Sequence, residues 1–323
     1  MQLPAEIQTA TLTMRPYGGE EDYWRVREFL RRTMILNQRH EYNWHVARLD
    51  YWWWFANPDL EHFRLEETVF LWETAGGEIA AVLNPEGHGQ AFLQVDPEHH
   101  APDLECKMIA VAEERLMRTD ADGRKRLWVF VDSQDRIRQE VLTRRGFQRV
   151  QEEDCREYQH RRSLDAPLPA PPSVPGYTIR PLGHGLELLE RCYASGLGFH
   201  SDDIHTAREN RDQPAWYRHI QSAPLYRRDL DIVAVADDGS IAAFCTVWFD
   251  DVARTAYFEP VATIPAHRRH GLARAVMIEG LHRLKRMGCK IAFVGGYSKA
   301  ANAVYFSVMG SDHNISEPWE KQR

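Results

Sequence analysis

The sequence predicts a mixed α/β (α+β) protein that contains the same fold twice. Three observations support this expectation. Short landmarks recur at a nearly constant spacing, a proline-rich segment lies between the two copies, and each copy alternates strand-like apolar runs with stretches of helical periodicity. Each half is therefore expected to build a sheet crossed by helices.

Four landmarks define the repeat. Their offsets along the chain are 165, 162, 163 and 164 residues, a constancy that is hard to obtain by chance. The landmarks and their copies are 13–16 (Thr-Met-Arg-Pro) and 178–181 (Thr-Ile-Arg-Pro), 77–82 and 239–244, Phe130-Val131 and Phe293-Val294, and Gly146 and Gly310.

A linker is predicted between the copies. Residues 165–176 contain five prolines in twelve positions, which neither a helix nor a central strand accommodates. We therefore expect one domain at residues 1–164, a semi-rigid linker at 165–176 and a second domain at 177–323.

Within the second half the sequence predicts the elements that matter for function. A strand is expected over about Thr255–Thr263, followed by a short basic loop and a helix over about Leu272–Met287. The apolar run 291–294 is expected to be a buried strand, and 298–308 another helix.

Composition excludes several classes of function. The net charge of −7 argues against a general nucleic-acid binder, and no apolar run has the length of a membrane span. The first twenty residues lack the apolar core of a secretory signal. Five scattered cysteines without a Cys-x-x-Cys pair indicate reduced thiols in a cytoplasm rather than a disulfide framework or a zinc site, and no metal is expected. A monomer or homodimer is expected as well. The pair His99-His100 is interpreted as a surface feature.

The most informative segment is the basic loop that precedes the helix expected over about Leu272–Met287. Gly271 lets the backbone approach a ligand closely, and Ala273 keeps the first helical turn narrow. The N–H groups of such a turn bind phosphate oxygens, and Arg268, Arg269 or Arg274 can add charge-assisted bonds. The alternative is a surface loop that contains arginines and begins an ordinary helix.

A second signal is Tyr305, on the helix that follows the neighbouring strand. A phenol has a pKa of roughly 10, above that of a thiol, and can therefore protonate a leaving thiolate. A buried tyrosine with a purely structural hydroxyl is the alternative.

Together these residues resemble the GNAT superfamily of acetyl-CoA-dependent N-acyltransferases. The similarity covers about residues 177–319. Arg268-x-x-Gly271-x-Ala273 fits the Gln/Arg-x-x-Gly-x-Gly/Ala coenzyme A loop of that family, and Ala301-x-x-x-Tyr305 fits its last helix motif. Ser298 stands where many members have Asn, and Gly310 comes one position late.

The resemblance implies two tandem GNAT-like domains, each with a mixed, mostly antiparallel sheet flanked by helices. It also implies a bulge near Pro260 in a strand that splays from its neighbour to form a slot for pantetheine. The residues expected to contact acetyl-CoA are Val261, Thr263, Arg268, Arg269, His270, Gly271, Leu272, Ala273, Arg274, Ser298 and Asn302.

A base is also required, because an amine of pKa roughly 10 is mostly protonated at neutral pH. Glu259 is our candidate, since the family often places a carboxylate at this position facing the acceptor. The alternative is a solvated glutamate on an edge strand. Asp250, Asp251, His200 and His205 are weaker candidates.

The first half is expected to lack a coenzyme site. Aligning Pro97 with Pro265 places Asp103 at Gly271 and Glu105 at Ala273, so that carboxylates occupy the position of a diphosphate. Leu142 falls at the position of Tyr305. This half is expected to support the structure or to shape the acceptor pocket.

The aromatic run Tyr51-Trp52-Trp53-Trp54-Phe55 is expected to pack mainly in a core, with a part left for a pocket or for the contact between the domains.

The sequence therefore predicts an acetyl-CoA-dependent N-acetyltransferase. Its C-terminal domain would acetylate a small-molecule amine by direct attack, with Glu259 as base and Tyr305 as acid. The alternative is a coenzyme A-binding sensor or interaction protein with a decayed catalytic site, which the departures at Ser298 and Gly310 leave open.

Overall fold

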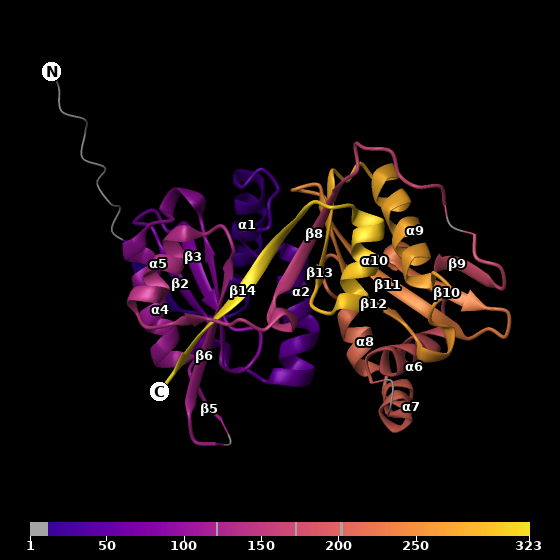
Figure 1. Ribbon diagram of the computed structural model, residues 1–323, viewed down its shortest axis with the longest axis horizontal. Coiled ribbons are helices and arrows are strands. Elements are labelled where there is room, and N and C mark those ends of the chain that lie inside the picture. The colour runs from indigo at the N-terminus through magenta and orange to yellow at the C-terminus, as the bar shows by residue number, and fades with distance from the viewer. Residues whose placement is uncertain (1–11, 121, 172, 201–202) are drawn as a thin grey trace.

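The computed structural model describes residues 12–120, 122–171, 173–200 and 203–323. Two halves of mixed α/β structure lie side by side, with the first half at the left of Figure 1 and the second at the right. Residues 1–11, where no secretory signal was expected, lie outside the described part, as does Pro172 of the linker. No helix in the described ranges is both long and apolar enough to cross a bilayer.

The N-terminal half begins with an antiparallel-paired strand and a long helix, and ends with a strand that leads to the linker. Its elements are β1 (Thr13–Pro16), α1 (Glu20–Leu36), α2 (Val46–Tyr51), a π-helical segment (Trp52–Glu61), α3 (Leu65–Thr68), β2 (Phe70–Glu73), β3 (Ile79–Asn84), β4 (Gln90–Val95), a 3-10 turn (Pro97–His99), α4 (Pro102–Arg115), β5 (Arg118–Thr119), β6 (Lys125–Asp132), α5 (Arg136–Arg144), β7 (Gln148–Arg149), a 3-10 turn (Glu153–Cys155) and β8 (Glu157–Ser163).

The C-terminal half repeats this order. Its elements are β9 (Tyr177–Pro181), α6 (Glu187–Phe199), α7 (Ile204–Asp212), α8 (Ala215–Ile220), a 3-10 turn (Arg228–Leu230), β10 (Asp231–Ala236), β11 (Ile241–Asp250), β12 (Thr255–Thr263), a 3-10 turn (Pro265–His267), α9 (Leu272–Arg286), β13 (Ile291–Gly296), α10 (Lys299–Met309) and β14 (His313–Gln322). The strands and helices predicted over 255–308 all form, with boundaries within one or two residues of those expected.

The repeat extends to individual side-chain contacts. Arg15 at the end of β1 holds Asp22 at 2.6 Å, and Asp22 accepts the N–H of Gly18 at 2.7 Å. At the positions 165 residues later, the guanidinium of Arg180 donates a hydrogen bond of 2.9 Å to the Glu187 carboxylate, which also accepts the N–H of Gly183. Both sets pin the first strand to the first helix, which supports the duplication inferred from sequence spacing.

The strands join into one continuous sheet in the order β1-β2-β3-β4-β6-β14-β8-β13-β12-β11-β10-β9. Most neighbours are antiparallel, and the parallel pairs are β4 with β6 and β12 with β13. The mixed, mostly antiparallel arrangement predicted for each half is confirmed.

The halves exchange their last strands, which the sequence did not predict. β8, at the end of the first half, pairs over residues 158–163 with β13 of the second half. β14, at the end of the second half, pairs with β6 of the first over residues 316–322. Figure 1 shows β14 in yellow crossing into the N-terminal half, where the chain ends. The two crossing strands meet each other over 313–316, so the exchange is reciprocal.

Three hydrophobic clusters hold the molecule together. One packs the sheet of the first half against α4 and α5, and a second packs the sheet of the second half against α9 and α10. The third lies between the halves and joins α1, α2 and the π-helical segment to α6, α8 and the opposite face of β10–β12. Burial of this shared cluster fixes how the halves meet.

The linker segment is held on the surface of α9 over its described residues. His282 contacts the carbonyl of Pro169 at 2.7 Å, and the Lys285 ammonium donates to the carbonyl of Ala166 at 2.9 Å. Leu168 and Val174 pack against the second cluster. The extended, non-helical path follows from the prolines.

Candidate active site

β12 carries a bulge at the position where the sequence predicts one. In its ladder with β11, Phe258 faces Val247 and Val261 faces Cys245, so Glu259 and Pro260 together oppose a single residue. The indole of Trp248 donates to the carbonyl of Glu259 at 2.6 Å. The bulge turns the end of β12 and aims Glu259 away from the regular ladder.

β12 and β13 also separate along their length. They pair only between Thr255–Tyr257 and Ile291–Phe293, although β12 continues to Thr263 and β13 to Gly296. Beyond Tyr257 and Phe293, the edges of β12 and β13 that face each other are not hydrogen-bonded to each other. Val261 and Thr263 lie on this edge of β12, in a position where an extended ligand can add backbone hydrogen bonds.

The loop that follows presents a run of backbone donors. Arg269 and Gly271 both have left-handed backbones, with φ of 68° and 78°, and Gly271 is the N-cap of α9. Within the described residues, the N–H groups of Arg269, His270 and Gly271 have no acceptor. The first N–H groups of α9 add to this set, because an α-helix leaves them unpaired.

The basic side chains of this loop project into solvent. Arg268, Arg269, His270 and Arg274 are exposed, and the guanidinium of Arg268 turns back to the carbonyl of Thr263 at 3.3 Å. Leu272 is buried in the core beneath the helix, so only its backbone N–H is available to a ligand, and Ala273 is half-buried. Anions are favoured at such a helix start.

Ser298 and Asn302 already have protein partners. The hydroxyl of Ser298 caps α10 by accepting the N–H of Ala301 at 3.2 Å. Asn302 is buried, and its Oδ1 lies 2.9 Å from Nε2 of His160, a residue of the exchanged strand β8. The expected coenzyme contacts of these two residues must therefore coexist with structural hydrogen bonds.

Tyr305 lies in the second turn of α10 and is 8% exposed. Its ring packs against Gly296 at the end of β13, where an added Cβ would lie 2.9 Å from the ring. Burial raises the pKa of the Tyr305 hydroxyl above its usual value, and the nearby Glu259 carboxyl raises it further. Tyr305 is therefore protonated at neutral pH and is available as a proton donor.

A pocket of about 850 Å³ opens where these elements meet. It takes in Glu259, Pro260 and Val261 of β12 and Tyr305 of α10, and it extends across the boundary to the π-helical segment of the N-terminal half. Glu259 and Tyr305, predicted from sequence 46 residues apart, are thus brought to one cavity.

Glu259 lies on the wall of this pocket and is half-buried, which differs from the solvated glutamate considered as the alternative. Burial raises the pKa of Glu259 to about 8; Arg48 opposes the rise, while Glu86 and Glu157 add to it. A carboxyl of this pKa exchanges protons readily with groups that titrate near neutral pH.

Among the other candidate bases, only His200 lines the pocket. Asp250 is fully buried and holds Arg31 of α1 at 2.9 Å, while Asp251 and His205 are exposed elsewhere. The geometry favours Glu259 over all four.

The sequence missed a charged cluster that the N-terminal half contributes to the same pocket. Arg48 of α2 forms two bonds to Glu86, of 2.7 and 2.8 Å, and two to Glu157 of β8, of 2.9 and 3.1 Å. Glu157 lies so close to Gly295 of β13 that a Cβ there would be 2.3 Å from its carboxylate. No local pattern could have revealed the cluster, since its members are far apart in sequence.

The equivalent loop of the N-terminal half is built differently. Two residues separate its 3-10 turn from α4, whereas four, 268–271, separate the corresponding turn from α9. When the N-terminal ends of α4 and α9 are aligned, Ala101 corresponds to Gly271. The sequence alignment that places Asp103 at Gly271 is therefore wrong by two residues, because the loop of the first half is shorter. Ala101 has an extended backbone (φ −144°), unlike the left-handed Gly271.

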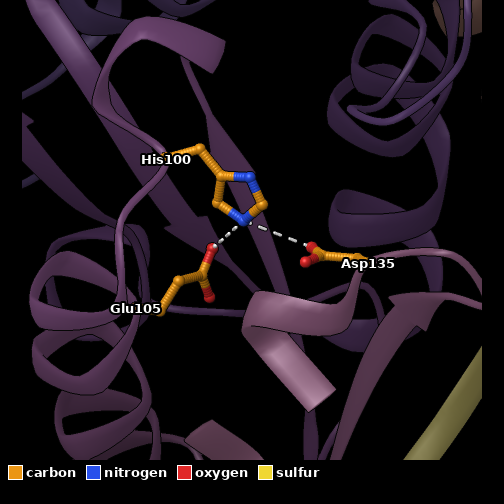
Figure 2. A group of neighbouring side chains, drawn as sticks. All are labelled: His100, Glu105 and Asp135. Atoms are coloured by element: carbon orange, nitrogen blue, oxygen red, sulfur yellow. Dashed lines mark ion pairs between the residues drawn. The ribbon is translucent and has the colours of Figure 1, made fainter. Parts of the chain in front are cut away.

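Charged side chains of the protein itself occupy the space beside this loop of the N-terminal half. His100 lies 3.2 Å from Glu105 and 3.3 Å from Asp135, as Figure 2 shows. The neighbouring carboxylates, that of Asp135 followed by that of Glu105, raise the pKa of His100 to about 9. Arg138 binds both oxygens of Glu105 at 2.8 and 2.9 Å. His100 is thus part of a half-buried ion network and not the surface histidine we expected.

The carboxylates in this network already have cationic partners. A guanidinium within the group opposes a metal ion by repulsion, and a diphosphate would face Glu105 and Asp135. Leu142 is the seventh residue of α5 as Tyr305 is of α10, and it is fully buried. At the equivalent positions the first half therefore has a buried leucine in place of the phenol, and a shorter loop flanked by carboxylates in place of the basic loop.

The aromatic run serves the shared cluster and the pocket together. Trp52 is 2% exposed, Trp53 stacks on Tyr23, and the Trp54 indole donates to the Tyr23 hydroxyl at 3.0 Å. Tyr51, Trp52 and Phe55 also line the pocket. The run therefore contributes both to the core between the halves and to the pocket.

Comparison with known proteins identifies the fold. Residues 189–310 match the Acetyltransferase (GNAT) family. A tandem GNAT protein from the clavulanic acid biosynthesis pathway, determined without AcCoA, superposes with a TM-score of 0.62 at 15% identity, over 97% of this chain and 98% of that one. No match is found among curated protein sequences.

Two further solved structures are similar. A GCN5-related N-acetyltransferase from Sphaerobacter thermophilus has a TM-score of 0.60 at 16% identity, with 96% of this chain and 95% of that chain covered. The glucosamine N-acetyltransferase region of a fungal multi-domain GH3 β-N-acetylglucosaminidase has a TM-score of 0.54 at 12% identity, over 98% of this chain and 38% of that chain. Residues 189–310 therefore form a domain of the GNAT acetyltransferase family, within a chain that has the fold of a tandem GNAT protein over nearly its whole length.

Proposed function

We propose that this protein transfers an acetyl group from acetyl-CoA to the amine of a small molecule, and that the reaction takes place in the C-terminal half. The observation that carries the proposal is the loop at Arg269–Gly271, whose unpaired N–H groups and left-handed Gly271 lie beside the open edge of β12. This combination suits a diphosphate followed by an extended pantetheine arm.

Each predicted coenzyme contact has a role in this proposal. The backbone of residues 269–274 holds the diphosphate, and Arg268, Arg269, His270 and Arg274 surround it with positive charge. The edge of β12 at Val261 and Thr263 pairs with the pantetheine amides, and Ser298 and Asn302 close the other side at the start of α10. Acetyl-CoA, when bound, supplies the thioester.

The residues of the pocket account for the proton transfers. Glu259 takes one proton from the ammonium form of the acceptor and passes it to solvent. The free amine attacks the thioester carbonyl, so that a C–N bond forms and the C–S bond breaks. Tyr305 protonates the leaving sulfur and recovers a proton from the acetylated nitrogen. The N-terminal half takes no part in the chemistry, because its own loop is filled by His100, Glu105, Asp135 and Arg138.

Direct attack is proposed because the cysteines are poor nucleophiles here. Cys192, Cys245 and Cys289 are buried, and burial raises the pKa of each thiol. None of the five cysteines lines the pocket within the described residues.

The test is a binding and turnover experiment on Gly271→Glu. An added side chain at Gly271 meets open space, so it would project toward the ligand without a clash inside the protein. Gly146→Glu is the matched control, since Gly146 also has a left-handed backbone (φ 83°) and open surroundings but lies in the N-terminal half. Acetyl-CoA affinity, measured by calorimetry, should fall at least tenfold in the first variant and stay unchanged in the second.

Thiol release over a panel of amines then separates the two candidate functions. Binding with acetyl transfer supports the enzyme. Binding without transfer to any amine supports the coenzyme A sensor, and unchanged affinity of Gly271→Glu rejects the proposed site.

A further inference from the structure

The pocket beside Glu259 has an aromatic wall to which both halves contribute. Tyr51 is the last residue of α2 and Phe55 lies in the π-helical segment that follows, and their ring centroids are 5.1 Å apart. Phe55 continues to Trp216 of α8 in the C-terminal half, at 5.3 Å. A ligand with a flat apolar body can pack along this wall.

The charge of the pocket is one-sided. Among the described residues, five carboxyl side chains line it, those of Asp59, Glu61, Glu86, Glu157 and Glu259, and Arg48 supplies the only guanidinium. The raised pKa of Glu259 leaves that group largely protonated at neutral pH, so the excess of negative charge comes from the other four.

Arg48 cannot offset this excess for a ligand. Its Nε and both terminal nitrogens are occupied by Glu86 and Glu157, and it is only 5% exposed. Two carboxylates on one guanidinium leave a net negative charge before Glu259 is counted. A cation is attracted here, whereas a carboxylate or phosphate on the acceptor is repelled.

The aromatic wall and the negative charge favour the same chemistry, because a cation also interacts favourably with the faces of aromatic rings. The volume of about 850 Å³ holds the end of the pantetheine arm together with a ring-sized acceptor.

We propose that the acceptor is a primary amine, bound as its ammonium ion, on an apolar ring-bearing body that carries no anionic group. Glu86 and Glu157, held by Arg48, set this preference, and Phe55 with Trp216 binds the ring. The proposal rests on the acetyl transfer proposed above and names the acceptor class for it.

Three commercially available amines isolate the two features of this proposal. 2-Phenylethylamine carries the cation and the ring, ethylamine carries the cation alone, and L-phenylalanine adds a carboxylate to the first. With saturating acetyl-CoA, kcat/KM for 2-phenylethylamine should exceed that for each of the other two by roughly tenfold or more.

Single substitutions test which side chains determine this preference among the three amines. Phe55→Ala should lower kcat/KM for 2-phenylethylamine and leave that for ethylamine nearly unchanged. Glu86→Gln frees part of the Arg48 charge, so the ratio of 2-phenylethylamine to L-phenylalanine should fall several-fold. Glu140→Gln removes one carboxylate from an exposed position on α5 and should leave both ratios unaltered.

Acetyl-CoA affinity is measured for every variant. If acetyl-CoA does not bind, the proposed function itself fails. If acetyl-CoA binds and L-phenylalanine or ethylamine is the better acceptor, or if none of the three is acetylated, the acceptor class is wrong while the coenzyme site stands. Equal losses on all three amines in Phe55→Ala would also overturn it, as they would indicate a purely structural role.

Discussion

The imidazole of His160 donates from Nε2 to Oδ1 of Asn302 over 2.9 Å and so joins β8 of the N-terminal half to the first turns of α10 in the C-terminal half. Both side chains are buried, and burial lowers the pKa of His160, which keeps the ring neutral. The bond links the exchanged strand directly to the helix that carries Tyr305.

Replacing His160 should therefore weaken the junction between the halves. His160→Ala leaves the Asn302 carbonyl buried without a donor, which costs about 1–3 kcal/mol of unfolding free energy. Urea unfolding measures the loss. His313→Ala, which removes a neighbouring and more accessible ring, is the control, and equal effects of the two variants would contradict a specific role for the hydrogen bond.

Removing the last strand should damage the opposite half of the molecule. Deletion of residues 313–323 takes away β14, which pairs with β6 over seven positions. Hydrogen exchange should accelerate in residues 126–132 of the N-terminal half and stay slow in β11, which β14 does not touch. Loss of protection confined to β13 and α10 would contradict the exchange of strands.

Activity should depend on the ionisation of Glu259. Because the base must be unprotonated and its pKa is raised to about 8, kcat/KM should rise about tenfold per pH unit below that value and then level off. Glu259→Gln should lose this dependence and at least 10²-fold of kcat/KM. The midpoint should be the same for two acceptors whose amines differ in pKa; a midpoint that follows the amine would exclude Glu259 as its source.

Tyr305→Phe should slow the reaction without weakening coenzyme binding. The substitution keeps the ring that packs on Gly296 and removes only the proton donor. We expect kcat to fall by roughly 10²-fold, within the range for general acid catalysis. Phe306→Leu, on the exposed side of the same helix, is the control. An unchanged kcat in Tyr305→Phe would leave the hydroxyl without a catalytic role.

Glu41 should make the protein less stable as the pH rises. It is 4% exposed, neither carboxyl oxygen has a partner among the described residues, and burial, followed by repulsion from Glu157, raises its pKa well above the usual value. The folded state therefore retains a proton that the unfolded chain loses above pH roughly 4.3, so folding weakens from that pH upward.

Glu41→Gln removes this dependence while keeping the shape of the neutral acid. It should unfold at a higher temperature than the wild type at pH 8, with a smaller difference at pH 5. Glu114→Gln, at an exposed position, should show no such trend. A difference that does not change with pH would exclude titration of Glu41 as the cause.

Much of the fold follows from local signals in the sequence. The strand over Thr255–Thr263, the loop and α9 were placed correctly, because a β-run, a glycine N-cap and a helical apolar stripe are each encoded within a few residues. The repeat was visible for the same reason, since duplicated segments retain their spacing even where side chains differ. Glu259 and Tyr305 were proposed from the family resemblance of the segments around them, and the structure brings both to one pocket.

Tertiary structure alone decided how the halves exchange strands and what lines the acceptor pocket. The sequences of β8 and β14 do not indicate which strands they pair with, because the backbone groups along every strand edge are chemically alike and the partner lies far away in the sequence. Arg48, Glu86 and Glu157 are likewise ordinary charged residues in sequence. They become one cluster only when α2, the loop between β3 and β4, and β8 are packed together, since the energy of a charge depends on what surrounds it rather than on its neighbours along the chain.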